Sequence, residues 1–308
     1  MRDVLSELLL DAARDERFLL LSADHGHRLF DALRDRHPDR FVNVGIAEQS
    51  MIGVAAGLAR TGFRPCVYGL ASFVPMRVLE QIKLDLCFAS EPVVLLGDGA
   101  GLVHSTLGAS HQCGEDVACL RSLPGIAVYS PCDGPELRAC WREARAADGP
   151  SYIRIGKADR PVVHEAEPGG TEPVLVVRAV DDAPRGVVLA TGAMVAAAVR
   201  FARARGLACI SVPRLSPAPE SLVPLIGPAR RVAVLEEHAS RGGLWSMVLE
   251  SIQASGRASE GVLVEPLGLA NAFTRSAGDH QHALSEHALD DASLQRRLEE
   301  WLARGEDR

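Results

Sequence analysis

A glutamate at the start of an apolar helix is the first residue in this chain that suggests chemistry. Glu48 follows the short apolar run 41–44 and precedes a stripe at helical spacing that begins with Met51 and Ile52. This spacing places its carboxyl group on the apolar face, where burial is costly without a partner and favours the protonated form. Two interpretations stay open: a solvated first-turn residue that favours the helix dipole, or a catalytic acid or base.

Polar side chains also follow the apolar run 18–21, which has the pattern of a buried parallel strand. Asp24, His25, His27 and Arg28 come directly after it. Ligands of parallel sheets gather where strands end at their carboxyl edge, so these side chains are expected near a ligand. A polar surface turn explains each of them singly just as well.

The segment 97–112 is a third candidate, because it is a long loop rich in Gly, Ser and His. Long irregular loops in compact domains often carry function. Histidine titrates near neutral pH, so His104 and His111 are suited to moving protons there.

Around these residues, apolar strand patterns alternate with amphipathic helices, which predicts an α/β fold with two doubly wound domains and mainly parallel sheets. The Pro- and Gly-rich segment 161–182 separates residues 1–160 from residues 183–308 as a linker. Strands are expected at 18–21, 41–44, 64–68, 93–96, 126–129 and 152–155, then at 186–190, 209–212, 232–235 and 262–265. Helices are expected at 4–13, 48–59, 72–87, 115–121 and 135–147, then at 195–205, 220–226, 244–255 and 291–302.

Composition narrows the class of protein. A net charge of -7 argues against a general nucleic-acid binder. No apolar run approaches the roughly 20 residues that cross a bilayer, and the start of the chain has no signal-peptide pattern, so we expect a cytoplasmic location and no membrane contact. The 7 cysteines include no Cys-x-x-Cys pair, and no cluster with metal-ligand spacing stands out. Cys66, Cys87, Cys140 and Cys209 are expected to be buried thiols in a reducing compartment.

Several motifs in order carry a resemblance. The run 43–49, Asn-Val-Gly-Ile-Ala-Glu-Gln, resembles the pyrimidine-binding domain of transketolases and related thiamine diphosphate (ThDP) enzymes. Glu236-Glu-His238 with Gly242-Gly243 resembles the C-terminal domain of the same family and is assigned to structure and subunit contacts. Further matching pieces lie at 71–73 with 80–82, at 108–112, at 131–133 and at 148–154. The resemblance implies a ThDP pyrimidine-binding domain at 1–160 and a transketolase C-terminal domain at 183–308.

The resemblance also implies roles for site residues. It makes Glu48 the catalytic acid that bonds the aminopyrimidine ring of ThDP and promotes loss of the thiazolium C2 proton. Phe73 matches the aromatic residue that stacks on that ring, although plain core packing is the alternative. Asp24 is expected to be one of the cofactor-binding residues. His111 matches a histidine that contacts the substrate near its reacting carbonyl, and His104 is a second candidate.

Basic residues suggest an anion site for the substrate. Arg2 and Lys157 fall where the family places phosphate ligands. Arg28 falls where a serine of the family usually helps to bind the phosphate, and His27 precedes Arg28 in the chain. Solvated surface cations are the alternative for each. Arg77 matches an arginine of split-type members, but its role is unassigned.

The metal motif of the family is incomplete here. Gly97-Asp-Gly99 resembles the start of a Mg²⁺ and diphosphate site, yet the only asparagines, Asn43 and Asn271, lie outside the window where a second ligand is expected. Asp98 is therefore interpreted as a loop residue, and no metal ligand is assigned to this chain. The resemblance then implies the C-terminal subunit of a split transketolase. An N-terminal partner would supply the diphosphate and Mg²⁺ ligands, in an expected heterotetramer.

Two departures from the family pattern bear on the substrate. Leu107 stands where an aspartate of the family often contacts a sugar hydroxyl. Gly99 stands at about the position where the family would have a histidine that contacts a phosphate. The interpretation is transfer of a two-carbon ketol unit from a non-standard or biosynthetic ketose to an aldehyde. The alternatives are a pyruvate-using ThDP carboligase, the β-type subunit of a 2-oxoacid dehydrogenase, and a non-catalytic scaffold partner.

Overall fold

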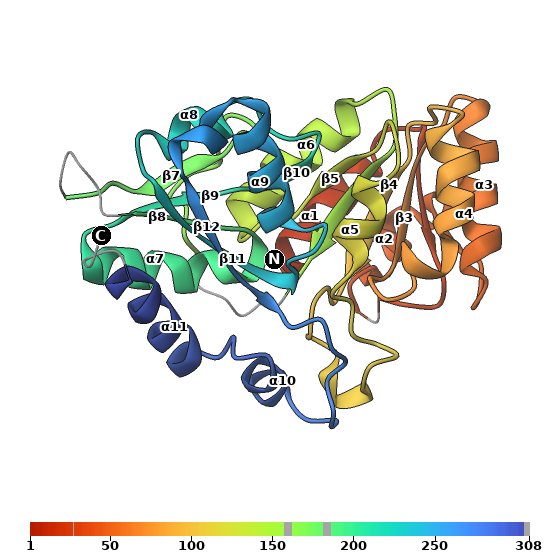
Figure 1. Ribbon diagram of the computed structural model, residues 1–308. Coiled ribbons are helices and arrows are strands. Elements are labelled where there is room, and N and C mark those ends of the chain that lie inside the picture. Colours follow the sequence, from red (N-terminus) through yellow and green to blue (C-terminus); the bar gives the residue numbers. More distant parts are fainter. Residues whose placement is uncertain (27, 157–161, 181–185, 305–308) are drawn as a thin grey trace.

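The computed structural model describes residues 1–26, 28–156, 162–180 and 186–304. It contains two mainly parallel sheets covered by helices, which confirms the predicted α/β class. The first sheet and its helices lie on the right of Figure 1, and the second sheet lies on the left. None of the helices in these described ranges is both long enough and apolar enough to span a bilayer.

The first sheet has the strand order β10-β5-β6-β4-β3-β1-β2, and only β10 is antiparallel to its neighbour. Its central strands are almost wholly buried apolar runs, as expected for parallel strands with helices on both faces. Its strands are β1 (Phe18–Ser22), β2 (Phe41–Asn43), β3 (Arg64–Leu70), β4 (Val94–Asp98), β5 (Ala127–Tyr129), β6 (Ser151–Ile155) and β10 (Arg214–Ser216). In register, Ser22 pairs with Tyr68 and Asp98 pairs with Leu70, so β1 and β4 end at the same edge.

Helices of the first unit cover both faces of this sheet. One face packs against α3 (Glu48–Arg60), whose Met51, Ile52 and Ala55 are buried at the predicted spacing. The other face packs against α1 (Arg2–Ala12) and α6 (Gly134–Ala146). The shorter helices are α2 (Asp31–Arg36), α5 (Asp116–Arg121) and the 3-10 turns η1 (Pro38–Arg40) and η4 (Ser105–Leu107).

The second sheet has the order β12-β11-β8-β9-β7. Its strands are β7 (Val174–Val177), β8 (Val187–Ala190), β9 (Ala208–Ser211), β11 (Arg231–Ala239) and β12 (Leu263–Leu269). Its helices and 3-10 turns are η5 (Gly192–Met194), α7 (Val195–Arg205), α8 (Leu222–Ile226), α9 (Leu244–Ala254), η6 (Arg257–Glu260), α10 (His280–Glu286) and α11 (Asp291–Ala303). The four cysteines expected to be buried are buried free thiols.

Three local predictions differ from the structure. The helix expected at 72–87 begins late, because Pro75 has no N–H to donate, and it consists of η2 (Met76–Val78), α4 (Leu79–Gln81) and the π-helical η3 (Ile82–Cys87). The expected linker 161–182 contains β7, an antiparallel edge strand of the second sheet. Strand β10, from the second unit, pairs with β5 of the first sheet. Tertiary pairing with partners far along the chain decides these short strands.

A buried ionic network joins the two sheets. The Arg154 guanidinium on β6 donates to Asp116 Oδ2 at 2.9 Å and to the Glu237 carbonyl of β11 at 2.8 Å. Arg154 and Asp116 are both buried, so each charge depends on the other for compensation. The Glu237 carboxylate accepts from the Leu102 amide at 2.8 Å, which ties the loop after β4 to the second sheet.

The neighbouring Glu236 caps a helix. Its Oε2 accepts from the Leu244 amide at 2.7 Å and its Oε1 accepts from the Trp245 amide at 3.0 Å, both at the start of α9. Burial raises the pKa of Glu236 to about 8, and burial lowers the pKa of His238 to about 4.

The free energy of unfolding is therefore expected to fall as pH rises from about 6.5 to 8. The folded pKa of Glu236 lies above its ordinary value of 4.5, so its stabilising contribution is full below pH 4.5 and is lost through about pH 8. His238 acts in the opposite direction, but only between about pH 4 and its ordinary value of 6.5. Glu236→Gln should flatten the profile above pH 6.5 in urea unfolding at several pH values. An unchanged slope in the variant would contradict this assignment.

Candidate active site

The candidate site forms where β1 and β4 end and α3 begins. Glu48 is the first residue of α3, and its side chain is 2% exposed. The interpretation of Glu48 as a solvated first-turn residue is therefore wrong. Its burial follows from the sequence, because it shares the helix face that Met51 and Ile52 bury.

Arg77 partners this buried carboxylate. Its Nη1 donates to Glu48 Oε2 at 3.0 Å, and its guanidinium carbon lies 4.1 Å from the centre of the Phe73 ring. The Arg77 side chain is 44% exposed, so the pair is buried on one side and wet on the other. Glu48 Oε1 is buried without a hydrogen-bond partner. The sequence left Arg77 without a role, and its guanidinium is the planar group that connects Glu48 to Phe73 in the fold.

Two histidines lie against Phe73. The His111 ring meets the Phe73 ring edge-on with centroids 5.3 Å apart, and the His25 ring lies 6.0 Å from Phe73 on the β1 side. Burial lowers the pKa of His25, which keeps its imidazole neutral near pH 7. Its Nε2 is buried without a hydrogen-bond partner. The fold thus brings His111 and His25 to the Phe73 ring, and Arg77 links the same ring to Glu48.

His104 fills the space beside Gly99. A Cβ atom built on Gly99, whose φ is +71°, would lie 2.1 Å from His104 Nε2, so only glycine allows this approach. Burial lowers the pKa of His104, and its Nε2 has no hydrogen-bond partner. The imidazole of His104 therefore occupies the space that a side chain at position 99 would take.

Asp98 is engaged inside the protein. It accepts from the Tyr68 hydroxyl at 2.5 Å and lies 3.9 Å from the Arg2 guanidinium. Asp98 is the last residue of β4, so its interpretation as a loop residue is wrong, and these contacts hold it at the edge of the sheet. They also bring Arg2, expected at an anion site, next to the loop that carries His104. Tyr68 was not singled out in the sequence, since a tyrosine inside an apolar strand carries no signal of its own.

The other predicted residues are less central. Asp24 is exposed and accepts from Asn43 Nδ2 at 3.0 Å, which joins the turn after β1 to the end of β2. Arg28 is exposed and adopts a positive φ of 62°. His27 and Lys157 lie outside the described residues, so their predicted roles stay predictions.

Apolar side chains are exposed around the site. Ile46, directly before α3, is 79% exposed, and Leu107 on η4 is 57% exposed. Val54 on α3 is also exposed. Exposed apolar side chains on segments that also carry site residues mark a surface suited to contact with another molecule.

A separate cavity lies between the loop after β4 and the second sheet. It has a volume of ≈ 360 Å³ and is lined by residues that include Gln112, Glu115, Phe273 and His287. None of the predicted site residues lines it. The Glu48 group is therefore separate from this cavity.

Together the described residues fit a flat heterocycle with a ring nitrogen. Such a ring would use the aromatic face of Phe73 and the unpartnered oxygen of Glu48. The Arg77 guanidinium, also flat and nitrogen-bearing, already shows that a planar group meets both side chains at once.

Comparison with known proteins places this geometry in context. Residues 1–161 match the model of the transketolase pyrimidine-binding domain. The chain is 35% identical over 302 residues to the 1-deoxy-D-xylulose-5-phosphate synthase of Myxococcus xanthus (strain DK1622), covering 96% of this chain but 50% of that protein. It is 33% identical over 260 residues to the 6-deoxy-6-sulfo-D-fructose transketolase subunit SqwH of Clostridium sp. (strain MSTE9), covering 82% of this chain and 80% of that subunit.

A solved structure gives the same picture for the fold. The inactive β4 tetramer of a split-gene transketolase superposes with a TM-score of 0.83 at 26% identity, covering 99% of this chain and 98% of that chain. The chain thus spans about half of the synthase but nearly all of a separately encoded subunit.

Arg77→Met is expected to lower the free energy of unfolding by about 1–3 kcal/mol, since it leaves the buried Glu48 carboxylate without its charged donor. In the double variant Arg77→Met/Glu48→Gln the cost should largely disappear, which a denaturant double-mutant cycle measures. Arg60→Met, which breaks the more exposed pair with Glu91, is the matched control and should cost less than about 1 kcal/mol. Equal costs for the two arginines, or strict additivity, would contradict the assignment.

Proposed function

Because the chain belongs to the transketolase family, whose enzymes use thiamine diphosphate, we propose that it is the C-terminal subunit of a two-subunit transketolase. The complex would transfer a two-carbon ketol unit from a ketose to an aldehyde. An N-terminal subunit would supply the diphosphate and Mg²⁺ ligands, in a heterotetramer. Residues 1–160 would form the pyrimidine-binding domain, and residues 183–308 the C-terminal domain.

The observation that carries this proposal is the form of the Glu48 site. The buried Glu48 carboxylate, the Phe73 ring and two imidazoles lie together, while Ile46 and Leu107 on the neighbouring segments are exposed. Exclusion of water strengthens acid–base groups, and a second molecule docked on these exposed apolar side chains would provide it. The match to 80% of the SqwH subunit supports the same division of the site between two chains.

Glu48 would hold a proton against the ring nitrogen of the bound cofactor. Its buried Oε1 has no other partner, so a nitrogen placed there meets an oriented carboxyl group. Thiamine diphosphate supplies, when bound, the carbon nucleophile and the electron sink of the reaction. Phe73 would stack on the aminopyrimidine, and Asp24 would support the turn at its edge. Arg77 must then share Glu48 or turn away, which its half-exposed side chain permits.

His111 and His104 would act on the substrate. His111 touches Phe73 from the loop side, and His104 lies deeper beside Gly99. The lowered pKa of His104 keeps its imidazole neutral, so it can donate or accept one hydrogen bond from a hydroxyl or carbonyl. Arg2, with Arg28, His27 and Lys157, would bind the anionic end of the substrate.

The substrate would be a non-standard or biosynthetic ketose. Leu107 offers no hydrogen bond where a sugar hydroxyl is usually recognised, and a lost buried hydrogen bond costs about 1–3 kcal/mol in discrimination. The SqwH relative is a 6-deoxy-6-sulfo-D-fructose transketolase subunit, which is consistent with an unusual sugar as the substrate here. Normal catalytic efficiency on xylulose 5-phosphate with ribose 5-phosphate would contradict this substrate class.

A second candidate is a pyruvate-using carboligase. The similarity to a 1-deoxy-D-xylulose-5-phosphate synthase and the apolar Leu107 favour it. A 2-oxoacid dehydrogenase β-type subunit would also use a 2-oxoacid. Both release CO₂ from pyruvate and a transketolase does not, so CO₂ release by the reconstituted enzyme distinguishes them.

Thiamine diphosphate with Mg²⁺ is expected to bind the mixture of this chain and its N-terminal partner, but not this chain alone. The partner is sought in an adjacent gene product that carries Gly-Asp-Gly with a downstream asparagine. Isothermal titration into each protein and into the mixture measures this. Tight binding to the isolated chain would refute the divided site.

Glu48→Gln is expected to lower kcat of the reconstituted enzyme by about 10²–10⁴-fold, because glutamine keeps the shape but cannot exchange a proton with the ring nitrogen. Steady-state assays with ketol transfer as the readout measure the loss. Glu7→Gln, at an exposed position on α1, is the control and should leave kcat unchanged. Full activity of Glu48→Gln would instead support the scaffold alternative.

A further inference from the structure

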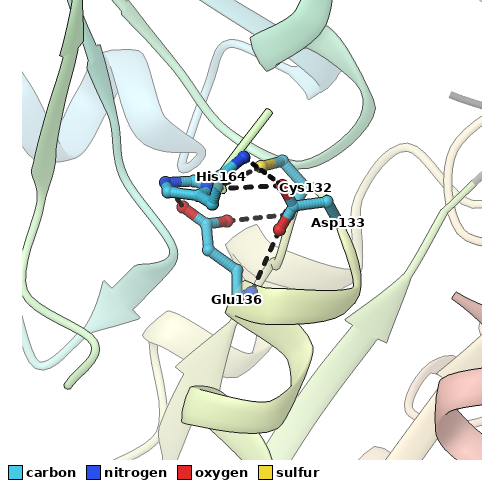
Figure 2. A group of neighbouring side chains, drawn as sticks. All are labelled: Cys132, Asp133, Glu136 and His164. Atoms are coloured by element: carbon cyan, nitrogen blue, oxygen red, sulfur yellow. Dashed lines mark hydrogen bonds and ion pairs between the residues drawn. The ribbon is translucent and has the colours of Figure 1, made fainter. Parts of the chain in front are cut away.

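A second group of reactive side chains lies at the turn between β5 and α6, and none of its members belongs to the Glu48 site. Cys132, Asp133 and Glu136 come from this turn, and His164 comes from the segment that follows β6 along the chain (Figure 2). All four are buried, and one donor atom of each lies within 4.8 Å of the others. The sequence showed no such cluster, because His164 is 28 or more positions from its neighbours.

The His164 ring is oriented by a carboxylate. Its Nδ1 lies 3.0 Å from Asp133 Oδ2, which also accepts from the amides of Val163 and His164 at 2.8 Å. With these bonds, Asp133 Oδ2 has no remaining capacity, and its role is to hold the ring. A carboxylate on one ring nitrogen is the usual arrangement when the other nitrogen binds a metal ion.

The other ring nitrogen has no hydrogen-bond partner among the described residues. His164 Nε2 is buried, the side chain is 7% exposed, and the nearest acceptor is Glu136 Oε1 at 3.4 Å. Two donors of one tetrahedral metal ion, with bonds of about 2.0–2.3 Å, lie about 3.3–3.8 Å apart. The separation between Nε2 and Oε1 is therefore that of two ligands of one ion and is long for a hydrogen bond.

Cys132 completes the donor set. Its Sγ lies 3.8 Å from His164 Nδ1, the nitrogen that Asp133 also contacts, and 3.9 Å from Ser211 Oγ, which donates to Glu136 Oε1 at 2.6 Å. Glu136 is fixed further, because its Oε2 accepts from the Cys132 amide at 2.8 Å. Each donor thus has an outer hydrogen bond or a neighbour that orients it before any ion arrives.

We propose that Cys132, Glu136 and His164 bind a thiophilic divalent cation of the zinc class, with Asp133 orienting the imidazole. A thiol, a carboxylate and an imidazole together select Zn²⁺ or Co²⁺ over Mg²⁺ or Ca²⁺, which prefer oxygen ligands alone. Three protein ligands leave a fourth position for water.

The site would stabilise the junction of the two units. It joins the turn before α6 to the segment at 162–164, and Ser211 of β9 brings in the second sheet. Nearby, the Gly192 amide donates to the Ser130 carbonyl at 3.1 Å across the same junction. The proposal does not depend on the transketolase activity, since no residue of the Glu48 site takes part.

The test is Co²⁺ titration into the chelator-treated full chain, without thiamine diphosphate, followed by absorption spectroscopy. We expect about one equivalent of Co²⁺ with a sulfur-to-cobalt charge-transfer band, displaced by Zn²⁺, and a thermal midpoint that rises with the metal. Cys132→Ser should abolish the charge-transfer band, and His164→Gln should weaken binding at least about 10-fold.

Cys119→Ser, at a partly exposed cysteine outside the cluster, is the matched control and should keep both the band and the affinity. Circular dichroism checks that each variant folds. A wild-type chain that binds no stoichiometric Co²⁺, or a band that persists in Cys132→Ser, would overturn the proposal even if a variant fails to fold.

Discussion

The buried guanidinium of Arg154 is the interaction on which the rest of the structure depends. From the centre of the first sheet it donates to the side chain of Asp116, to the carbonyl of Cys113 and to the carbonyl of Glu237. These three partners belong to α5, to the end of the loop after β4 and to the second sheet. A buried charge that loses a partner destabilises the fold strongly. The Arg154 side chain therefore fixes the positions of α5, the loop end and the second sheet relative to one another.

This constraint reaches the candidate site through the loop. The loop is held at its end by Arg154 and near its start by Glu237, whose carboxylate also lies 2.8 Å from His280 Nε2 on α10. His104 and His111 lie between these two anchors. The second unit therefore helps to position the candidate site, because its β11 and α10 fix the loop that carries both imidazoles.

The candidate site combines a paired buried carboxylate with buried polar atoms that lack hydrogen-bond partners among the described residues. The Glu48 carboxylate is buried deeply enough to need a partner, and Arg77 provides one that remains half exposed. One carboxylate oxygen and the ring nitrogens of His25 and His104 still have no hydrogen-bond partner. Unsatisfied buried polar atoms are rare in native proteins and gather where a ligand is bound. His164 Nε2, in the cluster between β5 and α6, is another such buried atom.

The sequence by itself determined the class of fold and placed Glu48 on the apolar face of its helix, because hydrophobic spacing within one helix or strand is a local property. It also indicated Phe73 and His111, through motifs that resemble a family. Only the tertiary structure showed which residues meet: Arg77 with Glu48 and Phe73, His104 with Gly99, and Cys132 with His164. Each of these depends on contacts between segments far apart in the chain, which local spacing cannot encode. The strands β7 and β10 were missed for the same reason, since three or four residues become a strand only when a distant edge pairs with them.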